Sequence, residues 1–202
     1  MDHSPIEFYF DFSSPYGYFA STQIEALAAE FGRQVSWRPI LLGPIFRRVG
    51  APPLVEVPLK GPYALRDFAR TARLFDIPYI HPAHFPIATV GAARAMLWTA
   101  AHHGQDKAAE FAHKVFHAFF AGQQDISNTD VVAALGDGVG LPPGQLLQGM
   151  NEPAIKEALK KQVEDAITRG VFGSPYLIID DEPFWGFDRF DHIRRWMRLR
   201  GR

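Results

Sequence analysis

The stretch of residues 8–18, FYFDFSSPYGY, decides how this chain begins to fold. Residues 6–12 form a short apolar run rich in aromatic side chains, which is typical of a buried β-strand. Ser14 and Pro15 then favour a helix N-cap with proline at the first helical position. The helical spacing of apolar residues beyond this pair predicts a helix that stops at Gly32.

The later segments extend this order of elements to the end of the chain. Residues 34–41 are typical of a second strand, so the first helix joins a parallel pair. Residues 43–62 carry several Pro and Gly residues, and we expect a long loop of the kind that is often functional. Helical patterns follow at 63–75, 90–103, 106–121, 128–136, 142–149 and 152–169. Residues 176–179 and 183–185 predict a hairpin, and residues 188–199 predict a final helix.

The order β-α-β, a helical block, then β-β-α predicts an α/β protein with a thioredoxin-like fold and an all-helical insertion. We expect residues 1–62 and 170–202 to form a discontinuous thioredoxin-like domain, and residues 63–169 to form the helical insertion domain. The helices of the insertion are expected to roof a cleft at Ser14, with residues 50–60 closing its side. The cavity beneath this roof should be apolar, with Tyr63 or Phe85 among its walls.

Composition excludes several classes of function. The chain of 202 residues has a formal net charge of −1 and no cationic stretch without nearby acids, which argues against nucleic acid as a partner. It has no apolar run long enough for a membrane span and no signal-peptide pattern at its start, so we expect a cytoplasmic protein. The His81/His84 and His102/His103 pairs suit a metal site poorly, and no metal is expected.

The absence of cysteine limits the chemistry further. It excludes a disulfide, a thiolate nucleophile on the chain and a disulfide oxidoreductase. Any thiol chemistry must use a thiol that arrives with a ligand. Ser14, at a strand-to-helix junction, could donate a charge-assisted hydrogen bond to such a thiol and lower its pKa. The alternative is that Ser14 only caps the helix.

A second signal lies just before the predicted hairpin, at Gly173-Ser174-Pro175. A proline that enters a strand after Gly-Ser is a candidate for a cis peptide bond. The residue before it would then turn its backbone polar groups outward, where an extended peptide can pair with them. An ordinary trans turn is the alternative. Asp11, inside the first strand, is expected to accept structural hydrogen bonds rather than to act as an acid or base.

Together these motifs resemble the 2-hydroxychromene-2-carboxylate isomerases and their relatives, the kappa-class glutathione transferases. The resemblance covers almost the whole chain, and it rests on FYFDFSSPYGY (8–18), VPLKGPYALRDFAR (57–70) and RGVFGSPYLIIDDEPFWGFDRF (169–190). It implies a DsbA-type fold and glutathione as the cofactor. It also implies reversible addition of the glutathione thiol to a small aromatic substrate, which interconverts 2-hydroxychromene-2-carboxylate and trans-o-hydroxybenzylidenepyruvate, or a related pathway intermediate. A homodimer is compatible with it.

The resemblance also implies roles for individual residues. Ser14 takes the place of the first cysteine of the oxidoreductase Cys-x-x-Cys, and Gly17 that of the second, so Ser14 is the implied catalytic residue that holds the glutathione sulfur as thiolate. Asp188 is implied to bind the γ-glutamyl ammonium; its position at the start of the predicted final helix offers N-capping as the alternative, and it could do both. Lys60 is implied to meet a glutathione carboxylate, with a solvated lysine as the alternative. The implied glutathione site is completed by Pro15, Tyr16, Ser174, Pro175 and Phe187.

The sequence departs from the family pattern at three places. Residues 50–53, Gly-Ala-Pro-Pro, and residues 85–88, Phe-Pro-Ile-Ala, each lack an Asn that relatives often carry. Phe187 stands where the kappa transferases have a serine. These departures put the acceptor substrate in doubt. Two other functions therefore stay open, a kappa-like glutathione transferase and a non-catalytic thioredoxin-fold binding module.

Overall fold

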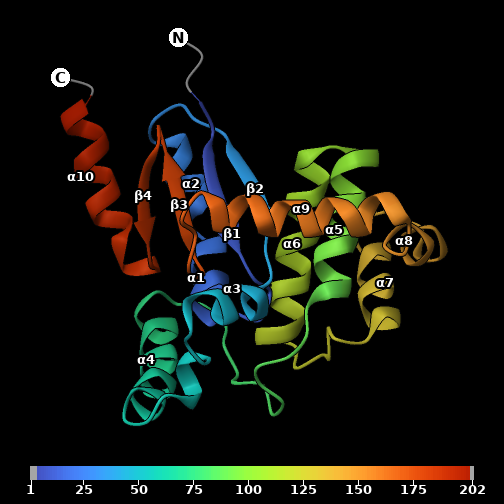
Figure 1. Ribbon diagram of the computed structural model, residues 1–202, viewed down its shortest axis with the longest axis horizontal. Helices are drawn as coiled ribbons and strands as arrows, with labels where there is room; N and C mark the ends of the chain where they lie inside the picture. Colours follow the sequence, from blue (N-terminus) through green and yellow to red (C-terminus); the bar gives the residue numbers. More distant parts are fainter. Residues whose placement is uncertain (1–3, 201–202) are drawn as a thin grey trace.

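The computed structural model describes residues 4–200, which are built around one sheet of four strands (Figure 1). The strands lie in the order β2-β1-β3-β4. They are β1 (Ile6–Phe10), β2 (Val35–Pro39), β3 (Tyr176–Ile179) and β4 (Glu182–Trp185). β1 runs parallel to β2 and antiparallel to β3, and β3 and β4 form the predicted hairpin. The sheet is therefore the one that the order of sequence patterns predicted.

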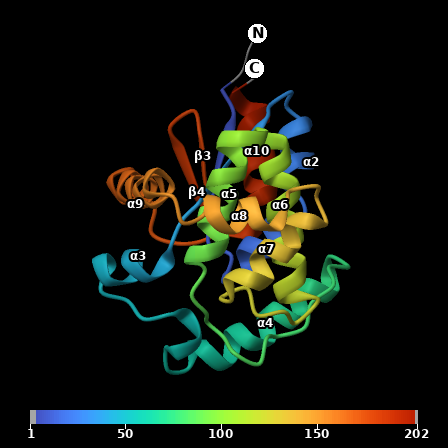
Figure 2. The same cartoon turned by 90° about the vertical axis from the view of Figure 1, so that its right-hand side faces the viewer.

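The helices lie on both faces of this sheet and at its edges. α5 to α8 stand beyond the edge strand β2, α10 lies beside β4, and α3 and α4 lie below the end of the sheet where β1 and β2 finish (Figures 1 and 2). α9 crosses one face of the sheet, where Ala166 packs with Tyr9 and Ile178, and α1 and α2 pack on the other face with Phe8 and Phe10. Their bounds are α1 (Pro15–Ser21), α2 (Ile24–Ala29), α3 (Leu42–Val49), α4 (Lys60–Leu74), α5 (Val90–His103), α6 (Gln105–Phe120), α7 (Thr129–Asp137), α8 (Pro143–Gly149), α9 (Pro153–Thr168) and α10 (Phe190–Arg200). Two short 3₁₀ helices, η1 (Leu54–Glu56) and η2 (Phe187–Arg189), complete the set.

An aromatic core fixes the end of β1 against the helices. Phe10 and Phe12 both contact Phe116 of α6, with ring centroids 5.3 and 4.9 Å apart. Tyr18 of α1 stacks on Phe120 of the same helix at 5.3 Å. Such ring pairs add to the free energy of burial. α6 therefore packs against residues that precede Ser14 in the sequence and against one that follows it.

The helix predicted to run to Gly32 is broken into α1 and α2. Ser21 donates its hydroxyl to the carbonyl of Tyr18 at 2.7 Å, and Thr22 donates to the carbonyl of Phe19 at 2.8 Å. Hydroxyl groups that bond to nearby carbonyls compete with the helical hydrogen bonds. The apolar spacing continues across the break, which is why the sequence did not reveal it.

The expectation of a long loop over residues 43–62 was wrong. The structure has α3, η1 and the first residues of α4 in this region. Pro44 lies in the first turn of α3, where its missing N–H has no intrahelical acceptor, and Gly50 ends the helix with a left-handed φ of 70°. The same Pro and Gly residues that indicated a loop are thus a helix start and a helix stop.

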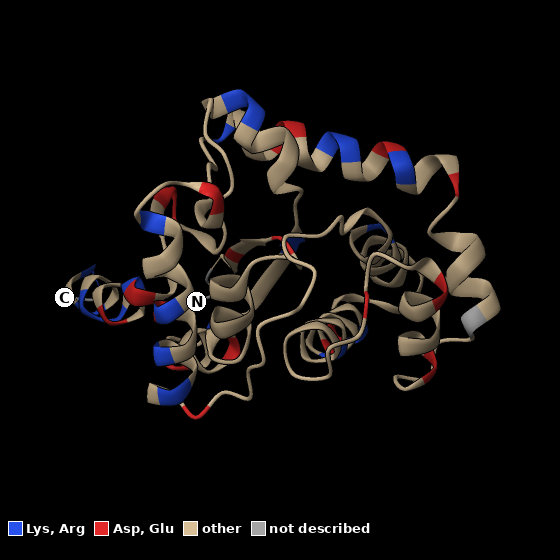
Figure 3. Cartoon of the chain, turned by 90° about the horizontal axis from the view of Figure 1, so that it is seen from below, with Lys and Arg blue, Asp and Glu red and all other residues tan. Residues whose placement is uncertain are grey.

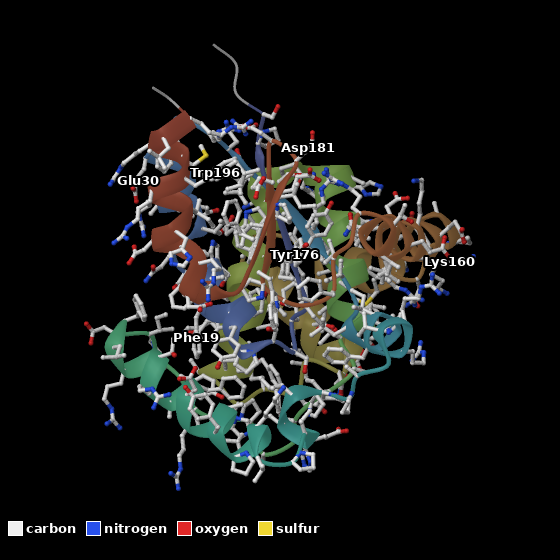
Figure 4. All side chains as sticks on the ribbon, turned by 60° about the vertical axis from the view of Figure 1, so that its left-hand side comes forward. Phe19, Glu30, Lys160, Tyr176, Asp181 and Trp196 are labelled. Carbon is white, nitrogen blue, oxygen red and sulfur yellow. The ribbon has the colours of Figure 1, made fainter. Side chains whose placement is uncertain are left out.

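Charges of both signs alternate over the outer surface. Lys and Arg are interspersed with Asp and Glu along α9, and Lys160 points outward at its far side (Figures 3 and 4). Within residues 4–200, no helix combines the length and the apolar character that crossing a membrane requires.

Candidate active site

Ser14 occupies the junction between β1 and α1, as predicted. It is the N-cap of α1, and its Oγ accepts a hydrogen bond from the N–H of Gly17 at 3.0 Å. The same hydroxyl donates to the carbonyl of Ser174 at 2.9 Å. The residue is 5% exposed. Capping is therefore confirmed, and the hydroxyl proton has an acceptor inside the protein.

The segment before the hairpin lies directly against this junction. The Ser174–Pro175 peptide bond is cis, which confirms the expectation. A second cis bond, Phe85–Pro86, was not predicted. The Oγ of Ser174 accepts a hydrogen bond from the N–H of Asp11 at 3.1 Å. Two hydrogen bonds, from Asp11 and from Ser14, thus tie the cis-proline segment to the end of β1.

Gly17 shows how close this approach is. A Cβ at this position would lie 2.8 Å from the Oγ of Ser174 and 3.1 Å from the Cβ of Ser14. These distances are shorter than a carbon normally tolerates. The position that holds a second cysteine in the oxidoreductases therefore has no room here for a side chain.

The carboxylate of Asp11 accepts three hydrogen bonds from segments around Ser14. It accepts from the N–H of Leu42 at 2.7 Å, the N–H of Ser13 at 2.9 Å and the hydroxyl of Thr89 at 2.7 Å. The structural role expected for Asp11 is confirmed. Burial raises the pKa of its carboxyl, against the opposing effect of these hydrogen bonds.

A cavity of about 1290 Å³ opens beside Ser14. Its wall includes all eight residues for which the resemblance implied a role: Ser14, Pro15, Tyr16, Lys60, Ser174, Pro175, Phe187 and Asp188. Tyr63 and Phe85 also line it, as predicted. The structure thus brings together residues that lie as far apart in the chain as Pro15 and Asp188.

The predicted roof is correct only in part. α4, Phe75 and residues 85–87 line the cavity, and residues 51–55 and 57 close its side. Among the described residues, helices α5 to α9 contribute nothing to the wall. α5 to α8 pack instead beyond β2, where their apolar residues join the core around Phe116 and Phe120, and α9 packs across the face of the sheet (Figure 1). The expectation that the whole helical block covers Ser14 was therefore wrong.

The two charged residues predicted for the site lie at exposed positions. Lys60 is the first residue of α4, and within residues 4–200 its ammonium has no hydrogen bond or ion pair. Asp188 lies in η2, and its carboxylate accepts a hydrogen bond from Nη2 of Arg189 at 2.7 Å. α10 begins two residues later, so the alternative that Asp188 is the N-cap of the last helix was wrong.

A polar network in the opposite wall was missed. The hydroxyl of Tyr16 donates to Oδ2 of Asp67 at 2.5 Å, and Arg70 donates to the other oxygen of Asp67 and to the hydroxyl of Tyr63. Burial and the nearby Asp67 carboxylate raise the pKa of Tyr16, so this phenol stays protonated at neutral pH. The i, i+3 spacing of Asp67 and Arg70 within the motif of residues 57–70 is the signal that could have indicated it.

The comparisons with known proteins agree with this geometry. The DSBA-like thioredoxin domain matches residues 5–198. A 2-hydroxychromene-2-carboxylate isomerase of Sphingobium xenophagum is 30% identical over 194 residues, which are 95% of this chain and 97% of that protein. The chain belongs to the 2-hydroxychromene-2-carboxylate isomerase family. The resemblance stated from the motifs is confirmed, and so is the DsbA-like thioredoxin fold.

A solved isomerase structure and a kappa-class glutathione transferase are also similar to this chain. A solved 2-hydroxychromene-2-carboxylate isomerase superposes with a TM-score of 0.85 at 27% identity, over 96% of this chain and 95% of that chain. The glutathione S-transferase kappa 1 of Caenorhabditis elegans is 25% identical, over 93% of this chain and 88% of that protein. Within the part of the chain that the structure describes, no three His, Asp or Glu side chains are grouped to hold a metal ion.

Proposed function

We propose that this protein is a glutathione-dependent isomerase that interconverts 2-hydroxychromene-2-carboxylate and trans-o-hydroxybenzylidenepyruvate, or a closely related aromatic compound. One observation carries the proposal. In a family whose oxidoreductase relatives use cysteine, the hydroxyl of Ser14 lies in the wall of a large cavity, 2.9 Å from the carbonyl before the cis proline. A thiol used at this place must come from a ligand, because the chain has no cysteine.

The groups in the wall fit glutathione, a tripeptide with one ammonium, two carboxylates and one thiol. The unpaired ammonium of Lys60 suits a carboxylate, and the carboxylate of Asp188 suits the γ-glutamyl ammonium. Ser174 is half-buried, and its backbone suits pairing with the extended cysteinyl part. Pro15, Pro175 and Phe187 supply apolar wall around these groups.

Glutathione, when bound, would supply a thiol able to add reversibly to a conjugated double bond, so that the bond can rotate. Ser14 would stabilise the thiolate form of that thiol. Its hydroxyl can turn from the carbonyl of Ser174 toward the cavity while its oxygen still accepts from Gly17. Tyr16 is protonated because its pKa is raised, and it donates that proton to Asp67, so it carries no negative charge that would repel a thiolate. The aromatic walls, including Phe68 and Phe85, would limit water around these groups.

The test is conversion of 2-hydroxychromene-2-carboxylate by the purified protein, followed by absorbance with and without glutathione. We expect conversion to require glutathione and the total thiol to be unchanged at the end. Stoichiometric loss of thiol would identify a kappa-like transferase instead. Absence of both turnover and glutathione binding would identify a binding module and overturn the proposal. A rate that does not depend on glutathione would contradict the proposal that Ser14 stabilises the glutathione thiolate.

Asp188→Asn is expected to weaken glutathione binding by about two- to fivefold, since an ion pair at an exposed position contributes little. The carboxylate is 70% exposed, and Arg189 already pairs with it. Asp191→Asn is the matched control, because Asp191 pairs with Arg194 at 3.0 Å, is also exposed and lies outside the cavity. Titration calorimetry with glutathione measures both. If the two variants bind glutathione equally well, Asp188 has no part in recognition.

A further inference from the structure

Arg94 on α5 is a half-buried cation without a partner. Its Nε is buried and has no hydrogen-bond partner. Within residues 4–200 its guanidinium makes no hydrogen bond and no ion pair. The other half-buried arginines of this part all pair with a carboxylate: Arg33 with Asp180, Arg38 with Glu7, Arg189 with Asp188 and Arg194 with Glu30. A half-buried guanidinium without a counter-charge leaves its donors available to an anion.

A cavity of about 240 Å³ lies beside this guanidinium. Its wall includes Val90 and Gly91 from the start of α5, Ser127 and Thr129 at the start of α7, and Asn151 after α8. It shares no lining residue with the cavity at Ser14. Arg94 is four residues beyond Val90, so both lie on the same face of α5. The cavity is therefore a separate place on the molecule.

The polar groups in this wall are mostly hydrogen-bond donors. Val90 and Gly91 are the first two residues of α5, and Thr129 is the first of α7, so their backbone N–H groups lack intrahelical acceptors. The hydroxyl of Thr129 has no hydrogen-bond partner in the described chain. Asn151 uses its amide N–H₂ for one bond to the carbonyl of Leu147, which leaves a second proton.

The acids of the adjoining segments do not neutralise the cation. Asp125 accepts two hydrogen bonds from Ser127, Asp130 lies in the first turn of α7, and Glu152 accepts from Trp98. None of these carboxylates is within ion-pair distance of Arg94. A half-buried guanidinium, a hydroxyl without a partner in the described chain and two helix N-termini thus belong to residues that line one small space, and no carboxylate lines it.

We propose that this cavity binds a small oxyanion, a phosphate or carboxylate group, held by Arg94 and Thr129 between the first turns of α5 and α7. A planar guanidinium and a helix N-terminus both suit such a group. The site lies next to the catalytic cavity along the chain. Ile87 lines the cavity at Ser14, Ala88 and Val90 line this one, and Thr89 between them donates to Asp11. The proposal goes beyond the isomerase function and does not depend on it.

The experiment measures binding of inorganic phosphate and of acetate by titration calorimetry at constant ionic strength, together with the Tm in each anion. Wild type is compared with Arg94→Met, which keeps the length of the side chain, and with Thr129→Val, which keeps its shape. Arg195→Met is the matched control, because Arg195 is an exposed arginine that has no ion pair among residues 4–200 and lies outside both cavities. Ser14→Ala tests whether the anion binds at the catalytic cavity instead of at Arg94.

We expect saturable binding of phosphate, acetate or both by wild type, by Arg195→Met and by Ser14→Ala. Arg94→Met should bind about tenfold to a hundredfold more weakly, the range for losing a charged hydrogen-bond donor. In chloride alone, Arg94→Met should have a Tm no lower than wild type, because an unpartnered cation has been removed. No saturable binding, or equal binding by Arg94→Met, overturns the proposal. A loss of affinity in Ser14→Ala would place the anion at the catalytic cavity and overturn it as well.

Discussion

Ser14→Ala is expected to lower kcat for the isomerisation by about 10²–10³, the range for one oriented donor aimed at developing charge. The hydroxyl lies where the strand end and the cis-proline segment meet, in the wall of the cavity. Removing it takes away the group that would stabilise a bound thiolate. The pKa of the thiol in the complex should then rise, so the loss of rate should shrink as the pH is raised. Stopped-flow absorbance across pH measures both effects.

The same substitution also has a structural cost that must be separated from the kinetic one. Ser14 caps α1, and loss of a cap destabilises by about 1 kcal/mol. Asn128→Ala is the control, because Asn128 caps α7 by accepting from the N–H of Asp130 at 2.8 Å and lies outside the cavity. We expect both variants to lose the contribution of a cap, Ser14→Ala to lose in addition the bond to the carbonyl of Ser174, and only Ser14→Ala to lose rate. If Ser14→Ala turns over within a few-fold of Asn128→Ala, Ser14 is only a cap.

The sequence predicted the parts of this fold that local patterns determine. The aromatic run before Ser14 is buried on both faces, so it gave a clear strand signal, and the hairpin at the other end of the chain was equally clear. Two proline-bearing junctions then indicated that residues 14 and 174 meet, because thioredoxin topology places them together. The structure confirms this with a hydrogen bond of 2.9 Å between them.

The sequence could not predict features that depend on which surface a helix faces. The periodicity of residues 90–169 gave the helices correctly but not the side of the sheet that they cover, so the roof over Ser14 was overestimated. The pairing of Tyr16 with Asp67 joins segments 51 residues apart, and neither residue is unusual in its local context. The lone cation at Arg94 is visible only when burial and partners are known.

Asp11→Ala is expected to reduce the free energy of unfolding by about 3–5 kcal/mol, because it leaves several buried donors without an acceptor. The N–H groups of Leu42 and Ser13 and the hydroxyl of Thr89 all lose their partner. These donors belong to the start of α3, the turn before Ser14 and the start of α5. One carboxylate thus joins three segments around the cavity. Urea unfolding measures the change, and a loss below about 1 kcal/mol would contradict this account.

Asp11→Asn distinguishes the hydrogen bonds from the charge. Asn keeps one oxygen that can accept from Ser13 and Thr89, so Asp11→Asn should lose less stability than Asp11→Ala. It still loses some, because the amide N–H₂ of Asn faces the N–H of Leu42.

Burial raises the pKa of Asp11 in the folded protein above its ordinary value of 3.8. The folded state therefore holds this proton more tightly than the unfolded state, and stability falls as pH rises between the two pKa values. The advantage of wild type over Asp11→Asn should be largest below pH 3.8 and should decrease as pH rises from there, until it becomes constant above the folded pKa. An advantage that increases with pH would show that the hydrogen bonds to the carboxylate outweigh its burial.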